Sequence, residues 1–377
     1  MSAGVRRTEA LIVGGGLAGS MLAMRLAGAG REVTLLERER CAHHKVCGEF
    51  LSREAVEYLR EAGVEPVELG AASIHSVRLS VKRRQVEARL PFAALSLSRH
   101  VLDEALLARA AERGCKVERG AAVESLTKRD GGWIADVREG EPWCAATVFL
   151  ASGKHDLRGM HREAGGQGDM VGFKLHWRLE AAQTQALRGF MELFLFRGGY
   201  GGLSLVEGDA ANLCLVVRRG ELRRVAGWDA LLAAICKVNC GLEERLQGAT
   251  ALWDRPLAIA SIPYGHLSGR SDGLWCVGDQ AAVIPSFTGD GMSIALHSAA
   301  MAAEMFLGGK SAEAYHDKLR KQLKRGMGLA TLISRMMVSG AGRGLAPLGL
   351  AVFPGAMEWI ARSTRIPQHS TAGHAVR

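Results

Sequence analysis

The chain has 377 residues, 48% of them hydrophobic and 23% charged, which is the balance of a folded globular protein with two domains or one large domain carrying an insertion. Its net charge is +9, but the 48 Lys and Arg are scattered and only four Tyr are present, so the composition argues against nucleic-acid recognition. The eight Cys form no C-x-x-C motif, which fits reduced thiols in a cytoplasmic enzyme, and the uncharged stretch at 344–357 is shorter than the ~20 residues of a membrane span.

The N-terminal segment predicts one βαβ unit. An apolar run over 9–13 is typical of a buried parallel strand, and a glycine-rich turn follows it. A helix over 18–28 and a second strand over 33–36, which ends at Glu37, complete a unit of about 30 residues.

The turn carries the pattern Gly14-x-Gly16-x-x-Gly19, in which each glycine has a physical role. The first permits a tight turn, the second lets a pyrophosphate approach the backbone, and the third lets the helix pack closely on the strand. The pyrophosphate then lies at the helix N-terminus, where N–H groups and the dipole favour an anion. Glu37 can accept hydrogen bonds from both ribose hydroxyls, which disfavours a 2′-phosphate. The cofactor-binding residues expected at this end of the chain are Gly14, Gly16, Ala18, Gly19, Glu37 and Arg38.

The middle of the chain predicts mainly strands between helices. Alternation of apolar and polar residues over 77–90 is typical of a strand or hairpin, and 98–113 is an amphipathic helix that Ser98 can cap. Gly-rich turns separate the strand-like segments of 116–150 and 171–217. Further helices are expected over 53–61, 228–234, 242–246, 292–307 and 312–325, and a short buried strand over 274–277.

A second group of residues, near 274–292, indicates which dinucleotide binds. The strand at 274–277 ends in Gly278-Asp279, Pro285 follows, and Gly289-Asp290-Gly291 opens a helix at Met292. This arrangement resembles the aromatic hydroxylases of the p-hydroxybenzoate hydroxylase type and the geranylgeranyl reductases. The resemblance implies FAD, with the aspartate on the ribityl chain and the helix N-terminus at the flavin N1–C2=O edge, where it stabilises the negative charge of the reduced ring. The residues expected to bind the flavin half are Gly278, Asp279, Pro285, Gly289, Gly291 and Met292.

The same resemblance extends to about residue 325 and adds four cofactor residues. Arg99 is similar to the arginine of that group whose side chain reaches the cofactor, and Val123 lies where the group's backbone touches adenine. Lys45-x-Cys47-Gly48 resembles the Lys-x-Cys-Gly segment of geranylgeranyl reductases, which places Lys45 and Cys47 at the cofactor.

One departure concerns the substrate. Geranylgeranyl reductases carry a Tyr-x-Trp-x-Phe-Pro segment, whereas the segment that begins at Tyr200 has neither tryptophan nor proline, which argues against a polyprenyl diphosphate. The sequence also has no second Gly-x-Gly-x-x-Gly for a nicotinamide cofactor. Members of the group often lack one, so transiently bound NAD(P)H or a partner protein is expected to reduce the flavin.

Together these patterns give a fold class of α/β, or α+β overall. We expect a Rossmann-type FAD-binding domain, an inserted antiparallel β-sheet substrate domain and a helical C-terminal tail. The boundaries are 1–72, 95–168 and 262–325 for the FAD-binding domain, 73–94 and 169–261 for the substrate domain, and 326–377 for the tail.

Three side chains are candidates for catalysis: Cys47, His176 and Tyr200. Cys47 is either a thiol near the flavin or a packing residue in its turn. His176 shares one strand face with Lys174 and Arg178, and it is a general acid or base if that face points to the flavin pocket and a solvent-facing residue otherwise. Tyr200 either lines the pocket or closes a hairpin. No metal site is expected, although Cys41 to Cys47 holds ligand types of a zinc site.

Three functions remain open at this point. The first, and the function we expect from the sequence, is an FAD-dependent monooxygenase or hydroxylase of a lipophilic aromatic or polyketide-like molecule. The second is a reductase or dehydrogenase of carbon–carbon double bonds similar to geranylgeranyl reductases. The third is a flavoprotein electron carrier. The apolar tail over 327–360 is interpreted as a helical cap on the substrate domain or as a membrane-surface contact for a lipophilic substrate.

Overall fold

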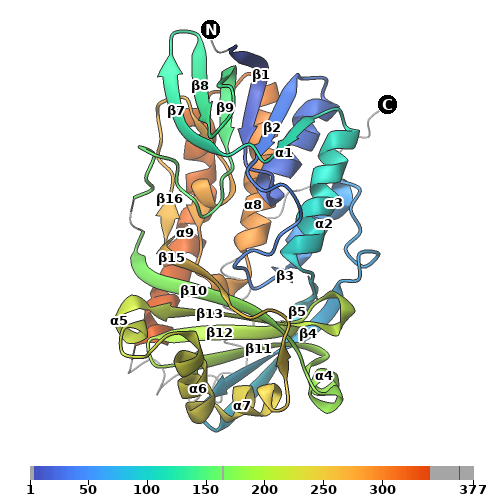
Figure 1. Ribbon diagram of the computed structural model, residues 1–377, viewed down its shortest axis with the longest axis vertical. Coiled ribbons are helices and arrows are strands. Elements are labelled where there is room, and N and C mark those ends of the chain that lie inside the picture. Colours follow the sequence, from blue (N-terminus) through green and yellow to red (C-terminus); the bar gives the residue numbers. More distant parts are fainter. Residues whose placement is uncertain (1–3, 164, 340–364, 366–377) are drawn as a thin grey trace.

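The computed structural model describes residues 4–163, 165–339 and 365 of the chain. Two β-sheets lie one above the other in Figure 1, with the N-terminal β1 in the upper sheet and β10 to β13 in the lower one. Helix α8 (Gly291–Leu307) stands beside the upper sheet, and helix α9 (Ala312–Val338) contacts strands of both sheets.

The first sheet contains the predicted βαβ unit. Within the described residues it has seven strands in the order β6-β2-β1-β9-β8-β7, with β17 paired to β9. Strands β6, β2, β1, β9 and β17 pair in parallel, whereas β8 pairs antiparallel with both β7 and β9. All five residues of β2 are buried, as the apolar run predicted. The strand bounds are β1 (Arg6–Val13), β2 (Val33–Glu37), β6 (Lys116–Arg119), β7 (Val123–Arg129), β8 (Gly132–Val137), β9 (Trp143–Leu150) and β17 (Trp275–Cys276).

Three helices cover this sheet and fix the turns that follow its strands. Helix α1 (Leu17–Gly28) packs against both α3 (Arg99–Glu112) and α8, and almost every α1 residue is buried. The Ser98 hydroxyl accepts a hydrogen bond from the Val101 N–H at 3.2 Å, so it caps α3 as the sequence predicted.

The second sheet is the inserted one. Its order is β14-β10-β13-β12-β11-β4-β5-β3, with β15 paired to β10, which makes nine strands among the described residues. Its pairs are antiparallel except for β11 with β4. The bounds are β3 (Phe50–Leu51), β4 (Ala72–Val81), β5 (Arg84–Ser96), β10 (Gln167–Arg178), β11 (Gly189–Phe196), β12 (Gly199–Leu205), β13 (Ala211–Arg218), β14 (Thr250–Ala251) and β15 (Leu257–Tyr264).

Short elements complete the two layers. A small two-stranded sheet joins β16 to β18, and short helices cover the ends of the second sheet. Their bounds are α2 (Arg53–Glu61), α4 (Ala181–Leu187), α5 (Arg219–Leu222), α6 (Trp228–Val238), α7 (Cys240–Leu246), β16 (His266–Leu267) and β18 (Ala282–Val283), with the 3₁₀ turns η1 (Glu207–Asp209), η2 (Gly278–Gln280) and η3 (Ser286–Thr288).

The helix expected over 312–325 is longer than the sequence suggested. Helix α9 runs without a break from Ala312 to Val338, so the expected tail boundary at 325 falls inside it. The extension is amphipathic: Met327, Ala330 and Val338 are buried, whereas Leu332 and Met336 are exposed. Most of the expected tail, 340–364 and 366–377, lies outside the described residues.

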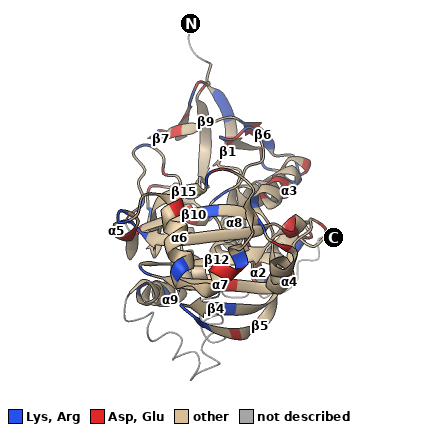
Figure 2. Cartoon of the chain, turned by 60° about the horizontal axis from the view of Figure 1, so that its bottom comes forward, with Lys and Arg blue, Asp and Glu red and all other residues tan. Residues whose placement is uncertain are grey.

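Charge and hydropathy place few further constraints on function. Figure 2 shows Lys and Arg interspersed with Asp and Glu along the same elements, which fits solvated faces better than a single basic patch. Among the described helices, none combines the length and the apolar character that crossing a membrane requires.

Candidate active site

A cavity of about 760 Å³ lies where the carboxyl ends of the first sheet's strands meet the second sheet. At one end it is lined by Glu37, Arg38 and Val123, and at the other by Gly289, Gly291 and Met292. Fourteen of the sixteen residues predicted to bind the cofactor line it. They are Gly14, Gly16, Ala18, Glu37, Arg38, Lys45, Cys47, Arg99, Val123, Gly278, Asp279, Gly289, Gly291 and Met292.

The glycine turn between β1 and α1 leaves room for a pyrophosphate. Gly14 has φ +108°, and a Cβ there would lie 2.5 Å from the Ala151 carbonyl oxygen. Gly19, which does not line the cavity, supports the turn from behind, because a Cβ on it would lie 1.9 Å from the Gly14 carbonyl oxygen. The Glu37 carboxylate is buried and accepts a hydrogen bond from the Gly15 N–H at 2.6 Å. This acid therefore holds the turn as well as facing the ribose position.

Two cations stand beside the same turn. A Cβ on Gly16 would lie 3.3 Å from Arg99 Nη2 and 3.4 Å from Lys45 Nζ. Asp103 holds both: Arg99 donates to it at 2.7 and 2.9 Å, and Lys45 at 2.7 Å. Burial opposes the charge of Asp103, but the two cations outweigh it and keep the pKa of Asp103 below its ordinary value. A charged guanidinium and ammonium at a helix N-terminus suit a pyrophosphate.

The flavin end of the cavity is built by the loop between β17 and α8. Asp279 forms an ion pair with Lys154 at 3.3 Å, and Lys154 also donates to the Val46 carbonyl at 3.3 Å. Burial disfavours the Lys154 charge, but Asp279 outweighs it and raises the pKa of Lys154. Pro285, the second predicted residue that does not line the cavity, caps η3 just before the α8 loop.

These residues fit FAD. One cavity is lined by the ribose-binding acid Glu37, by the glycine turn with its two cations and by the N-terminus of α8. The N-terminus of α8 at Gly291 presents N–H groups to the place where the resemblance puts the flavin N1–C2=O edge.

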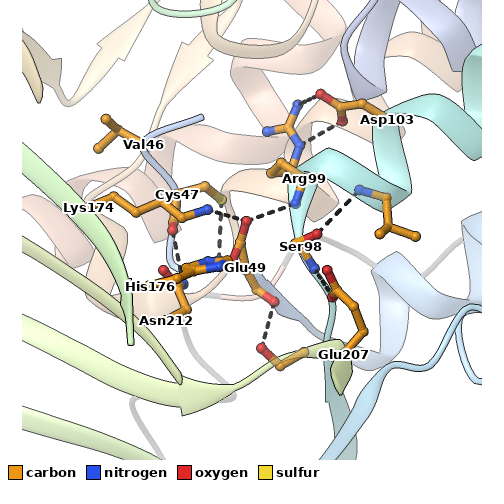
Figure 3. Close-up of polar contacts among 12 residues, drawn as sticks. Val46, Cys47, Glu49, Ser98, Arg99, Asp103, Lys174, His176, Glu207 and Asn212 are labelled. Carbon is orange, nitrogen blue, oxygen red and sulfur yellow. Dashed lines mark hydrogen bonds and ion pairs between the residues drawn. The ribbon is translucent and has the colours of Figure 1, made fainter. Parts of the chain in front are cut away.

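The segment that follows Lys45 connects the flavin end to the second sheet, as Figure 3 shows. The Cys47 thiol lines the cavity and accepts a hydrogen bond from the Glu49 N–H at 3.4 Å, and the Asn212 amide donates to the Cys47 carbonyl at 3.2 Å. Glu49 is fully buried and has φ +58°, and its carboxylate accepts hydrogen bonds from Arg99 N–H at 2.8 Å, from Lys174 and from His176.

The charges of this cluster are balanced inside the protein. Lys174 is fully buried, and His176 Nε2 lies 2.9 Å from Glu49 Oε2. Burial opposes ionisation of Glu49, but the His176 hydrogen bond and the Lys174 charge outweigh it and hold its pKa below the ordinary value. Burial and the Lys174 charge lower the pKa of nearby His44 to about 4, so this imidazole is neutral at pH 7.

His44, Glu49 and His176 also have the donor types of a metal site, and their ligand atoms lie within 4.8 Å of one another. This set differs from the Cys41 to Cys47 segment considered in the sequence. The Lys174 ammonium already neutralises the Glu49 carboxylate, so a divalent cation would add a net positive charge to a buried site. The charge balance therefore disfavours a metal here.

Comparison with known proteins agrees with the cofactor geometry. Residues 7–148 match the family model described as an FAD binding domain. The protein is an FAD-dependent oxidoreductase. The flavoprotein is 24% identical over 359 residues to a menaquinone reductase of Mycolicibacterium smegmatis, a match that covers 88% of this chain and 85% of the relative. It is 28% identical over 320 residues to digeranylgeranylglycerophospholipid reductase 2 of Methanopyrus kandleri, with 79% and 76% covered.

The fold is also that of a solved flavoenzyme structure. The flavin-dependent brominase Bmp2 superposes with a TM-score of 0.78 at 17% identity, over 95% of this chain and 93% of that one. At this identity the likeness concerns the fold, so the chemistry of the flavoprotein has to be argued from its own residues.

Tyr200 of the flavoprotein does not line the cavity but contacts residues that do. Tyr264 and Ser286 line the cavity; the Tyr264 hydroxyl donates to Ser286 at 2.9 Å, and the Ser286 hydroxyl donates to Tyr200 at 3.4 Å. Burial raises the pKa of Tyr200. Its ring packs edge-on against Phe287, at 6.0 Å between centroids. Tyr200 therefore contacts the cavity through Ser286, and His176 contacts it through Glu49.

The second sheet gives the flavoprotein cavity an apolar wall. Ile259 and Ile262 of β15 and Val46 converge around Gly172 of β10, where a Cβ would lie 3.1 to 3.2 Å from each of their side chains. Val216 of β13 continues this wall. An apolar surface opposite the flavin end suits a lipophilic substrate.

Sequence reasoning did not single out Glu49, Lys154 or Lys174 as site residues. Glu49 stood in the quoted Lys-x-Cys-Gly segment, but nothing in the sequence marked it as buried. Lys174 shares a strand face with His176, and that spacing was the available signal. Arg365 pairs with Asp290 at the start of α8 at 2.7 Å, a contact across 75 residues that no local pattern carries.

Proposed function

We propose that this flavoprotein reduces a carbon–carbon double bond of a lipophilic, isoprenoid-type molecule. The observation that carries the proposal is that Cys47 lines the same cavity as the α8 N-terminus and the apolar residues Ile259 and Ile262. Two relatives named as reductases, which match over most of their length, support this reaction over hydroxylation. The Lys-x-Cys-Gly segment of the sequence points the same way.

Reduction of a double bond adds a hydride to one carbon and a proton to the other. Bound FAD, once reduced, supplies the hydride. The protein has to supply the proton, and we assign this role to Cys47, which lines the cavity and whose sulfur accepts a hydrogen bond from the Glu49 N–H. Arg99 and Lys154 are the cations that interact electrostatically with Cys47.

The other residues hold the two reactants. Val46, Ile259 and Ile262 exclude water from the substrate side, so that the double bond is oriented by apolar contact. Glu37 and the glycine turn hold the adenosine half of the cofactor, and the α8 N-terminus faces its ring. The electron donor that reduces the flavin is proposed to be NAD(P)H bound transiently.

The proposal is tested anaerobically. Protein with photoreduced FAD is mixed with lipophilic alkenes, among them a menaquinone analogue and a polyprenyl alcohol, and flavin reoxidation is followed with the mass of the product. We expect reoxidation without O₂ and a product that has gained two hydrogens. Cys47→Ser should keep FAD and slow this step by about a hundredfold, since general acid catalysis contributes 10²- to 10⁴-fold.

Other results would support the other two functions. Product that gains one oxygen, and forms only when O₂ is admitted, identifies a monooxygenase. A stable flavin semiquinone without any product identifies an electron carrier. Either outcome refutes the reductase proposal.

A further inference from the structure

The buried cluster behind Cys47 has more charged and titratable groups than holding a loop requires. Glu49 and Lys174 are fully buried, and His176 is 3% exposed. Burial of an ion pair is costly, and an apolar pair of similar volume would hold the loop as well or better. Titratable groups in this position suit a function in which a proton moves.

The cluster is in direct contact with Cys47. The Glu49 N–H donates to the Cys47 sulfur, and the Glu49 carboxylate accepts from Lys174, so thiol and ammonium meet at one residue (Figure 3). The β10–β13 register agrees: Lys174 pairs with Cys214, which lines the cavity, and His176 pairs with Asn212, which binds the Cys47 carbonyl.

The two oxygens of Glu49 face different partners. Lys174 binds Oε1, and His176 Nε2 binds Oε2. A carboxylate that accepts a proton on one oxygen and releases one from the other can pass a proton from His176 to Lys174 without moving.

His44 provides the outer end of this path. Its ring lies 4.9 Å from the His176 ring and is stacked at 4.9 Å on the half-buried His100. The ligand atoms of His44, Glu49 and His176 lie within 4.8 Å, a distance that one water molecule can bridge. His44 lines the cavity and is partly exposed.

We propose that His44, His176, Glu49 and Lys174 form a proton relay that resupplies the Cys47 thiol after each reduction. This inference rests on the proposed function. In the reaction the Cys47 S–H bond breaks and a C–H bond forms on the substrate, while the hydride from reduced FAD forms the second C–H bond. A proton then leaves the Lys174 ammonium and restores the S–H bond.

The amine of Lys174 regains its proton from His176 through Glu49, and His176 regains one from solvent by way of His44. The net change per turnover is one proton taken from water and one hydride taken from reduced FAD, which together saturate the double bond. The groups that interact with Cys47 are the cations Arg99 and Lys154, the Glu49 N–H and the thiol Cys214, whose pKa burial raises to about 12. Lys174 interacts with two of these groups, Glu49 and Cys214.

The relay predicts that a variant of it keeps the rate of the first turnover and slows the later turnovers. In His176→Gln, whose amide still donates to Glu49, one equivalent of product should form at the wild-type rate, because the relay acts only after the first proton has been transferred. Later turnovers should slow by about a hundredfold and show a larger solvent isotope effect. His75→Gln, which replaces a histidine packed against Gly189 outside the cavity, is the matched control and should behave as wild type.

A second measurement does not depend on turnover. In flavin-free protein, alkylation of Cys47 by iodoacetamide is followed by peptide mass against pH. The variant Lys174→Met removes the ammonium and keeps the Glu49 carboxylate, and we expect its alkylation midpoint to move to higher pH, because the site loses a cation while the anion stays.

The outcomes separate the two proposals. Wild-type protein that yields no reduced product overturns the proposed function and the relay together. Wild-type reduction with unchanged later turnovers in His176→Gln overturns the relay alone, and so does an unshifted alkylation midpoint. The purified protein is also analysed for metal. A stoichiometric metal ion that is lost in His176→Gln would overturn the relay and indicate a metal site on His44, Glu49 and His176.

Discussion

Replacing Glu49 with Gln probes the buried pair on which the site depends. The carboxylate accepts three hydrogen bonds, from Arg99 N–H, Lys174 and His176, and both members of the ion pair are fully buried. Glutamine keeps the shape and one acceptor oxygen, but it leaves the Lys174 ammonium in the interior without a counter-charge. Breaking a buried pair in this way costs about 3–5 kcal/mol. We expect the free energy of unfolding to fall by that amount at pH 7.

The free energy of unfolding that Glu49→Gln loses should depend on pH, and this dependence gives a second test. Burial without a counter-charge favours the neutral amine, so folding of the variant releases a proton from Lys174. The unfolded state then binds more protons than the folded state, and stability rises with pH. Urea titrations of flavin-free protein, followed by tryptophan fluorescence between pH 6 and 9, should show the deficit shrinking as the pH increases.

The double variant Glu49→Gln with Lys174→Met is the control. It removes the unpaired charge, so it should regain most of the lost free energy of unfolding. If Glu49→Gln costs less than about 1 kcal/mol, or if Lys174→Met does not restore stability, the pair is solvated and our account of the cluster is wrong.

Three further predictions concern the cofactor and the acid range. Gly14→Val should purify without flavin, because its Cβ would enter the Ala151 carbonyl, whereas Gly220→Val, at a glycine with no neighbour within 4 Å, should stay yellow. Asp279→Ala should weaken FAD binding, measured by fluorescence titration, at least tenfold, a loss of about 1.4 kcal/mol; unchanged affinity would remove Asp279 from the site. Folding lowers the pKa of His44 to about 4, whereas in the unfolded chain it is ~6.5. Between these two values the unfolded state binds more protons, so the free energy of unfolding should decrease as the pH falls from about 6.5 to 4. His44→Asn should flatten that slope, and an identical slope would contradict it.

The cofactor half of the site could be predicted from the sequence because its determinants are local. A glycine turn needs particular residues at fixed spacing, since backbone approach and helix start are decided within a few residues, as Gly14 and Gly289 illustrate. Helix α3 began where Ser98 predicted, for the same reason. The length of α9 was underestimated because its second half is held by tertiary contacts: Ser334 donates to Gln167 of β10, and Val338 packs in one core cluster with Tyr200 of β12.

The chemistry beside the flavin was decided by tertiary structure. His176 and Lys174 could be placed on one strand face from the alternation of β10, but their partner Glu49 lies 125 residues before Lys174 in another segment. Burial turns these groups into a coupled cluster, and burial depends on how the second sheet packs over the Cys47 loop. The sequence by itself therefore determined that the protein binds FAD, whereas only the packing of one sheet against the other decided which side chains can move a proton there, because charge interactions strengthen when water is excluded.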